Sequence, residues 1–104
     1  MSLDYSYASG TAVAVVAAGF AFLGTEDMVM PVGVLIGGTF VGTVLVECCN
    51  DPAAGSPTWV PFGSAVTVPG TVKIDIPVKA VRLRCSAYTS GTIQGYISGA
   101  KGTT

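Results

Sequence analysis

The residues best suited to chemistry in this chain are its three cysteines, Cys48, Cys49 and Cys85. Metal binding or a redox step would need sulfur atoms that converge on one side of the backbone. Cys48 and Cys49 are neighbours at the end of the apolar run "GTVLVE", where a strand directs successive side chains to opposite faces. The chain has no CxxC spacing. We therefore predict no metal site, and we interpret Cys48 and Cys85 as small buried residues in phase with the apolar side chains of their strands.

A disulfide between Cys48 and Cys85 remains open at this point, on the condition that their strands are neighbours. The odd number of cysteines argues against it. The expected cytosolic setting also argues against it, because thiols stay reduced there.

Other catalytic groups are scarce. The chain has no histidine, which excludes Ser-His-Asp and Cys-His nucleophile pairs and most catalytic zinc sites. Glu26 and Asp27 are adjacent, so they face opposite ways on a strand or form a solvated tip in a turn. No glycine pattern follows a strand and opens a helix, as phosphate-binding loops require. We predict no catalytic residue, no cofactor and no metal, and we expect that the protein is not an enzyme.

The only tryptophan, Trp59, follows the turn-forming segment "NDPAAGSP". Asn, Asp and Pro start turns and glycine allows positive φ, so this segment predicts a loop between two strands. Trp59 could stack on a sugar there. We favour a packing role, in which the ring closes one end of the fold and its indole N–H bonds to a loop carbonyl, because apolar residues follow it. The predicted structural core includes Cys48, Trp59, Leu83 and Cys85.

Short antiparallel strands are the elements that must position these residues. Turn-forming residues recur roughly every eight to twelve positions, which is typical of an all-β sandwich or barrel. Segments such as "TVKIDI" and "AVRLRCS" alternate apolar and polar residues, so one face of each strand is buried. We predict one all-β domain over residues 11–104, an antiparallel two-sheet sandwich of about eight short strands, with a jelly roll favoured over an Ig-like sandwich. Residues 1–10 are expected to form an N-terminal arm that orders on a neighbour.

Two segments are candidates for a protein interface. Residues 82–99 predict a β-hairpin around Ser90 and Gly91 whose exposed face is rich in Arg and Tyr, the residues that interfaces favour. The alternative is a solvated outer face. The second segment is the N-terminal part, where many residues are apolar on both faces of the expected strands. The interface candidates are Leu3, Tyr5, Tyr7, Arg82, Arg84, Tyr88, Gln94 and Tyr96.

The chain is poor in charge. Only 11% of its residues are charged, against about 25% in typical soluble domains. Such a surface is expected to associate, so we predict a homo-oligomer, either a dimer or a trimer. All five basic residues lie at or after Lys73, and five of the six acids precede it. This division suits copies that meet acidic surface to basic surface, whereas a nucleic-acid partner would need denser basic clusters.

The apolar residues 11–24 raise the question of export or membrane insertion. The first ten residues carry one acid and no base, unlike a signal peptide. The run has 14 residues, fewer than the roughly 20 of a spanning helix. A membrane hairpin over residues 11–42 is an alternative, but no Lys or Arg flanks it to set an orientation. We expect a cytoplasmic protein without a membrane partner.

An ordered set of motifs runs through residues 41–98: "GTVLVE", a turn-rich loop with "TWVPF", then "AVTVPGTVKIDIPVKAVRLR" and "SAYTSGTIQGYIS". It resembles small capsid decoration (cement) proteins of tailed bacteriophages, in which a strand leading to "SxDGGxTW" and then "VPAKAVRVRVSG" recurs. This chain departs at the loop, which reads "CNDPAAGSPTW". The resemblance implies a small jelly roll that assembles in the host cytoplasm, forms oligomers and binds the major capsid protein on the capsid exterior. It implies no catalytic residues.

From these observations we predict a virion structural protein that reinforces the capsid by multivalent binding, with no nucleic acid, membrane or small-molecule substrate as partner. The first alternative is a module of the phage neck or tail, or a receptor-binding or carbohydrate-binding module that uses Trp59, Tyr88 and Tyr96. The second is the small membrane protein described above.

Overall fold

Strands account for all the regular structure of the residues that can be described. The computed structural model describes residues 2–29, 31–50 and 58–103, and these contain no helix, and so none that could cross a membrane. The strands are β1 (Ser2–Ala12), β2 (Val16–Val29), β3 (Val32–Gly37), β4 (Phe40–Cys49), β5 (Val60–Pro61), β6 (Gly70–Ile74), β7 (Val78–Gly91) and β8 (Ile93–Thr103).

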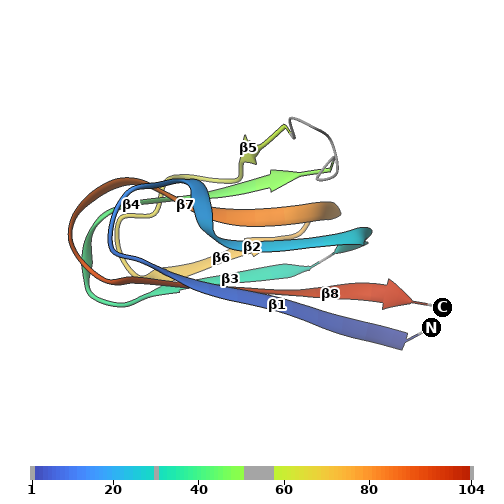
Figure 1. Ribbon diagram of the computed structural model, residues 1–104. Helices are drawn as coiled ribbons and strands as arrows, with labels where there is room; N and C mark the ends of the chain where they lie inside the picture. Colours follow the sequence, from blue (N-terminus) through green and yellow to red (C-terminus); the bar gives the residue numbers. More distant parts are fainter. Residues whose placement is uncertain (1, 30, 51–57, 104) are drawn as a thin grey trace.

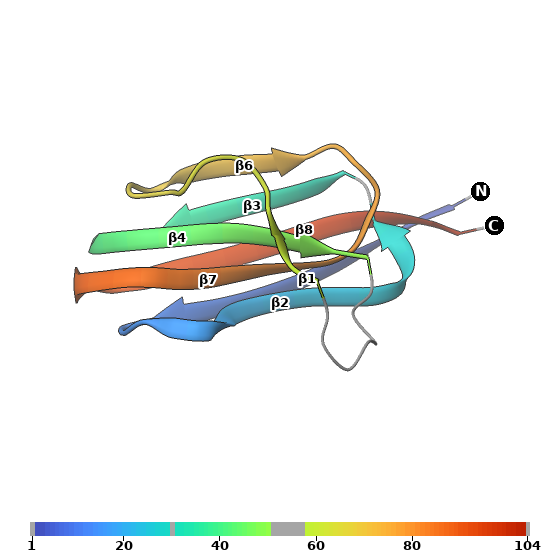
Figure 2. The same ribbon diagram turned by 90° about the horizontal axis from the view of Figure 1, so that it is seen from above.

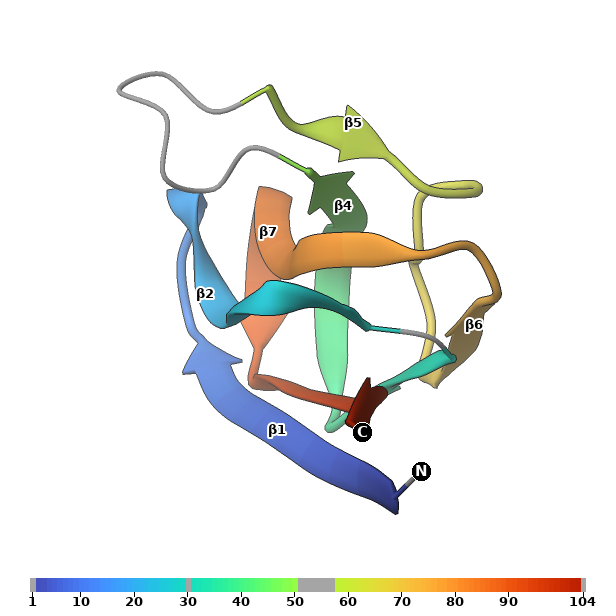
Figure 3. The ribbon, with the colours of Figure 1, turned by 90° about the vertical axis from the view of Figure 1, so that its right-hand side faces the viewer.

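The strands form two antiparallel four-stranded sheets that lie face to face (Figure 1, Figure 3). We call them the β1 sheet, with the order β1-β8-β3-β6, and the β2 sheet, with the order β2-β7-β4-β5. The predicted all-β sandwich is therefore confirmed. Strand pairs β1·β8, β2·β7, β3·β6 and β4·β5 are all antiparallel, and each connection except β4–β5 passes from one sheet to the other. This winding of a folded ribbon is the jelly-roll arrangement.

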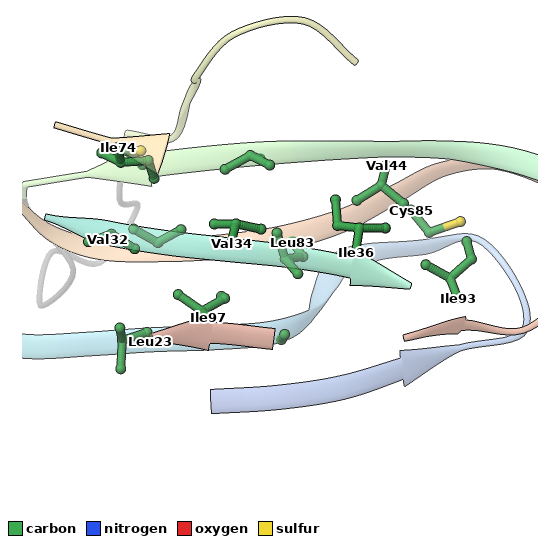
Figure 4. Packing of buried hydrophobic residues seen from close by; sticks show 14 of the residues in the cluster. Leu23, Val32, Val34, Ile36, Val44, Ile74, Leu83, Cys85, Ile93 and Ile97 are labelled. Atoms are coloured by element: carbon green, nitrogen blue, oxygen red, sulfur yellow. The ribbon is translucent and has the colours of Figure 1, made fainter. Parts of the chain in front are cut away.

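The core lies between the sheets and follows the predicted alternation. On β3, Val32, Val34 and Ile36 are buried, while Gly33 and Leu35 are exposed. Figure 4 shows side chains from both sheets meeting in this layer. The buried cluster includes Leu23, Val44, Val46, Cys48, Ile74, Val81, Leu83, Cys85, Ile93 and Ile97. Because strand side chains point alternately to the two faces, these residues close the interior and leave the polar positions outside.

Strand β1 includes most of the segment for which the sequence predicts an arm. It pairs with β8 along its whole length, from Ser2 opposite Thr103 to Ala12 opposite Ile93. Its backbone is thus an edge strand of the β1 sheet, next to β8, and both chain ends lie at the same end of the sandwich (Figure 1, Figure 2).

The predicted hairpin over residues 82–99 is wrong in one respect. Strands β7 and β8 follow one another but belong to different sheets, because the chain turns from one layer to the other at Gly91 and Thr92. Gly91 has a φ of 92°, which glycine adopts without strain. The Thr92 amide donates a hydrogen bond of 2.8 Å to the Thr39 carbonyl and so joins this turn to the β3–β4 turn. The two halves of the expected interface therefore lie on opposite faces of the sandwich.

Candidate interaction surfaces

The cysteines lie at buried positions on two neighbouring strands. Cys48 and Cys85 belong to the core cluster, while Cys49 is buried on the other face of the β2 sheet. Cys48 pairs with Val81 and Cys85 pairs with Val44. The two thiols are thus four residues apart along the strands, roughly 13 Å, whereas a disulfide needs Cα atoms within about 7 Å. This register excludes the disulfide between Cys48 and Cys85 that the sequence left open.

The environment of Cys48 also opposes thiolate chemistry. Burial raises the pKa of Cys48 from 9.0 to about 11, and the neighbouring Cys49 thiol adds to the rise. The Cys85 thiol donates a hydrogen bond of 3.3 Å to the Ala87 carbonyl. Since the thiolate is the form that attacks electrophiles and binds metals, Cys48 is held in its unreactive form at neutral pH. Within residues 2–29, 31–50 and 58–103, no three His, Cys, Asp or Glu side chains gather as a metal site would require.

A buried ion cluster lies on the outer face of the β2 sheet. Glu47 on β4 is only 5% exposed, and its Oε1 atom accepts hydrogen bonds from Arg82 Nε at 2.8 Å and Arg84 Nε at 3.1 Å. Glu47 is directly opposite Arg82 in the register of β4 and β7. The two arginines were expected to be exposed for a partner, but their side chains are 18% and 28% exposed and are engaged by this carboxylate. The sequence did not indicate Glu47, because it occupies an outward position on an alternating strand.

Trp59 covers this cluster and does not belong to the core. The Arg82 guanidinium carbon lies 4.4 Å from the centroid of the Trp59 ring, a distance typical of a cation–π contact. The Phe22 ring meets Trp59 edge to face, with centroids 5.9 Å apart and an interplanar angle of 76°. The prediction of Trp59 as a core residue was wrong, because β5 is the edge strand of the β2 sheet and the residue before it is directed to the outer face. The loop segment 51–57, predicted as a turn, lies outside the described residues.

A second surface is a groove on the outer face of the β1 sheet. Tyr7 on β1 is 78% exposed and Tyr96 on β8 is 48% exposed, and Leu35 on β3 is also exposed. With Ser9 and Ser98 these side chains line a groove of about 350 Å³. Gln94 is also exposed and lies two residues before Tyr96 on β8. The structure thus places Tyr7, Gln94 and Tyr96 on one sheet and separates them from the arginines.

The remaining interface candidates have different positions. Tyr88 on β7 is half-buried against the core, and its hydroxyl donates a hydrogen bond of 2.6 Å to the Gly91 carbonyl. It therefore supports the β7–β8 turn and is not part of an exposed Arg and Tyr face. Leu3 and Tyr5 lie on β1, but their side chains are outside the part of the chain whose side chains the structure describes.

A third surface, which we call the valine end, is formed where four turns meet opposite the chain termini (Figure 1). The turns join β1–β2, β3–β4, β5–β6 and β7–β8. Val13, Val15, Val41 and Val68 lie in or beside these turns and are between 55% and 66% exposed. Among the described residues, none of those at this end is charged, because the turns fall in the charge-free segments 5–25, 28–46, 52–72 and 85–100. The charge-free segments are visible in the sequence, but only the fold brings their turns together at one end of the sandwich.

Comparison with known proteins adds a weak structural likeness. No family model and no curated protein matches the chain. A solved structure, "Cyanophage Pam1 capsid asymmetric unit", contains a chain to which this one is similar, with 17% identity over 96% of this chain and 85% of that chain and a TM-score of 0.37. A likeness at this TM-score carries no argument about function.

Proposed function

We propose that this protein is a virion structural protein that binds the outside of a phage capsid through its valine end and stabilises the shell. The observation that carries the proposal is the exposure of four valines on a surface without charge. An apolar surface of this kind is costly to leave in water and marks a contact site. The sequence resemblance to capsid decoration proteins supplies the kind of partner, the major capsid protein.

The size of the valine end implies that one contact is weak. Fully burying a valine contributes about 1.5 kcal/mol, so covering the exposed part of four valines contributes about 4 kcal/mol, equivalent to a Kd of about 1 mM before the entropic cost of association. A useful occupancy therefore requires several contacts made together. A dimer or trimer that engages several capsid subunits at once multiplies the affinity in this way. Because a single contact is weak, we propose that the protein acts as a homo-oligomer.

The proposed role is mechanical and includes no catalysis, cofactor, nucleic acid or membrane partner. The absence of histidine from the sequence and the raised pKa of Cys48 support a non-enzymatic role. In this proposal the chain assembles in the host cytoplasm and remains on the capsid exterior.

The test is to add the purified protein to capsids that lack it and to measure co-sedimentation and the capsid melting temperature. We expect the wild-type protein to bind and to raise that temperature. Val41→Asp should abolish binding, since it places a charge within the valine end. Val60→Asp is the matched control, because Val60 is equally exposed but pairs with Cys48 away from the valine end.

Circular dichroism and thermal unfolding of each variant establish that it is folded. Failure of the wild-type protein to bind capsids would contradict the proposal, as would equal loss of binding in both valine variants. Binding to isolated necks or tails but not to capsids would favour the alternative position in the virion.

A further inference from the structure

The groove on the β1 sheet has a regular arrangement of tyrosine and serine. Tyr7 lies opposite Ser98, and Ser9 lies opposite Tyr96, on the antiparallel strands β1 and β8. The two tyrosines are therefore diagonal neighbours, about 7–8 Å apart between their Cα atoms. Leu35 on β3 is directly opposite Tyr96 on its other side. Two aromatic rings and one aliphatic side chain thus alternate with two hydroxyl groups across three strands.

The chemistry of this groove is neutral. Among the residues whose side chains the structure describes, its lining holds the hydroxyl groups of two tyrosines and two serines and no charged side chain. Among the described residues, the charge on this outer face is Lys73 on β6, which pairs with Gly33 at the far side of β3. A phosphate, a sulfate or an acidic peptide would meet no cation among these lining residues. The groove fits a ligand with an apolar face for the rings and with neutral hydroxyl groups for the polar side chains.

Size distinguishes a small ligand from a protein. The volume of about 350 Å³ lies within the range of roughly 300–1,000 Å³ for small-ligand sites. By contrast, strands β1, β8, β3 and β6 have 11, 11, 6 and 5 residues, which at about 3.3 Å per residue and about 4.8 Å between strands give a face of roughly 520 Å² in projection. A stable protein interface needs about 800 Å² from each partner. A second copy that covered this face alone would fall short of that area.

We propose that the groove between Tyr7 and Tyr96 binds a neutral saccharide, with the rings stacked on the sugar and the serine and tyrosine hydroxyls bonded to its hydroxyl groups. The site is separate from the valine end, so a subunit attached to a capsid by that end would keep the groove available. This inference goes beyond the proposed function and does not depend on it. It also differs from the sequence-based hypothesis of a sugar site at Trp59, whose ring is covered on one side by Arg82.

The first measurement is binding of the labelled full chain to an array of neutral, sialylated and sulfated oligosaccharides. We expect binding to neutral glycans, and titration of the best one should shift backbone NMR signals of β1, β3 and β8. Tyr7→Ala and Tyr96→Ala should each weaken binding about tenfold or more. Phe22→Ala is the matched control, since Phe22 is an exposed ring on the other sheet, and it should keep the affinity.

Several results would overturn the inference. These are no neutral glycan bound, a preference for charged glycans, or signal shifts confined to β2, β4 and β5. Another is binding of a proline-rich peptide at the groove in place of any sugar. The NMR signal shifts of the wild-type protein locate the binding site even if a tyrosine variant fails to fold. Retention of capsid binding by the tyrosine variants, and of glycan binding by Val41→Asp, would separate this site from the proposed capsid contact.

Discussion

Replacing Glu47 by glutamine removes the charge that holds Arg82 and Arg84 together on the outer face of the β2 sheet. The carboxylate accepts a hydrogen bond from each arginine, at 2.8 Å and 3.1 Å. Glutamine has nearly the same shape, so the substitution tests the charge and leaves the packing in place. Without the carboxylate, two guanidinium groups that are 18% and 28% exposed lose the negative charge that lies between them.

The size of the effect follows from burial. Two unit charges 4 Å apart contribute about 4 kcal/mol at an effective dielectric constant of 20, but the cost of desolvating Glu47 offsets part of this. Removing one partner of a buried ion pair costs about 3–5 kcal/mol. Because Arg84 keeps more contact with water, we expect the low end of that range, about 3 kcal/mol. For a domain of this size the corresponding fall in Tm is about 12 °C or more.

The assay is urea unfolding followed by fluorescence. Trp59 is the only tryptophan in the chain and lies over Arg82, so its emission reports on this cluster. Asp75→Asn is the matched control, because Asp75 is exposed, and it should change stability by less than about 0.5 kcal/mol. If Glu47→Gln were as stable as Asp75→Asn, the argument that this charge stabilises the sheet would be refuted.

Two further predictions concern the thiols and the turns. Burial raises the pKa of Cys48 to about 11, so the neutral Cys48 thiol contributes stability to the folded state that is complete below pH 9 and is lost as the pH rises from 9 through about 11. A Cys48→Ala variant lacks this contribution and should show a smaller loss of Tm than the wild-type protein over this interval. Equal losses of Tm would contradict the prediction. Gly91→Ala should destabilise the fold by about 2 kcal/mol or more, because alanine disfavours the φ of 92° and its Cβ would meet the Thr39 carbonyl oxygen. Gly63→Ala is its control, with a similar φ of 74° but open space around it, and thermal unfolding should show a larger loss for Gly91→Ala than for Gly63→Ala.

The fold class was predictable because alternation is a local property of the chain. Val81, Leu83 and Cys85 are buried as the pattern in "VRLRCS" indicates, and the segment "GTVLVE" lies within β4, Phe40–Cys49. The pattern was less reliable at strand ends. Ile76 has the phase of a core residue, but β6 ends at Ile74, and Ile76 is half exposed.

The candidate surfaces were harder to predict, because each depends on strands that are distant in sequence. Glu47 is an outward residue by alternation, yet it is buried because Arg82 and Arg84 come from β7 and Trp59 precedes β5. Tyr88 and Tyr96 are eight positions apart on what reads as one hairpin, yet they lie on different sheets. Alternation assigns a residue to one side of its own strand and does not identify what lies above that side.

The order of apolar and polar residues settled that this chain forms strands, which side of most strands is buried, and that the neighbouring Cys48 and Cys49 face opposite sides of their strand. The reason is that the direction of a side chain is set within two or three residues of backbone. The tertiary structure alone decided the strand partners, such as β1 with β8 from opposite ends of the chain, and with them the separation of Cys48 from Cys85. It also gathered the charge-free segments at the valine end and set Tyr7 beside Tyr96. Those relations depend on how the two sheets close over a shared core, which no short segment encodes.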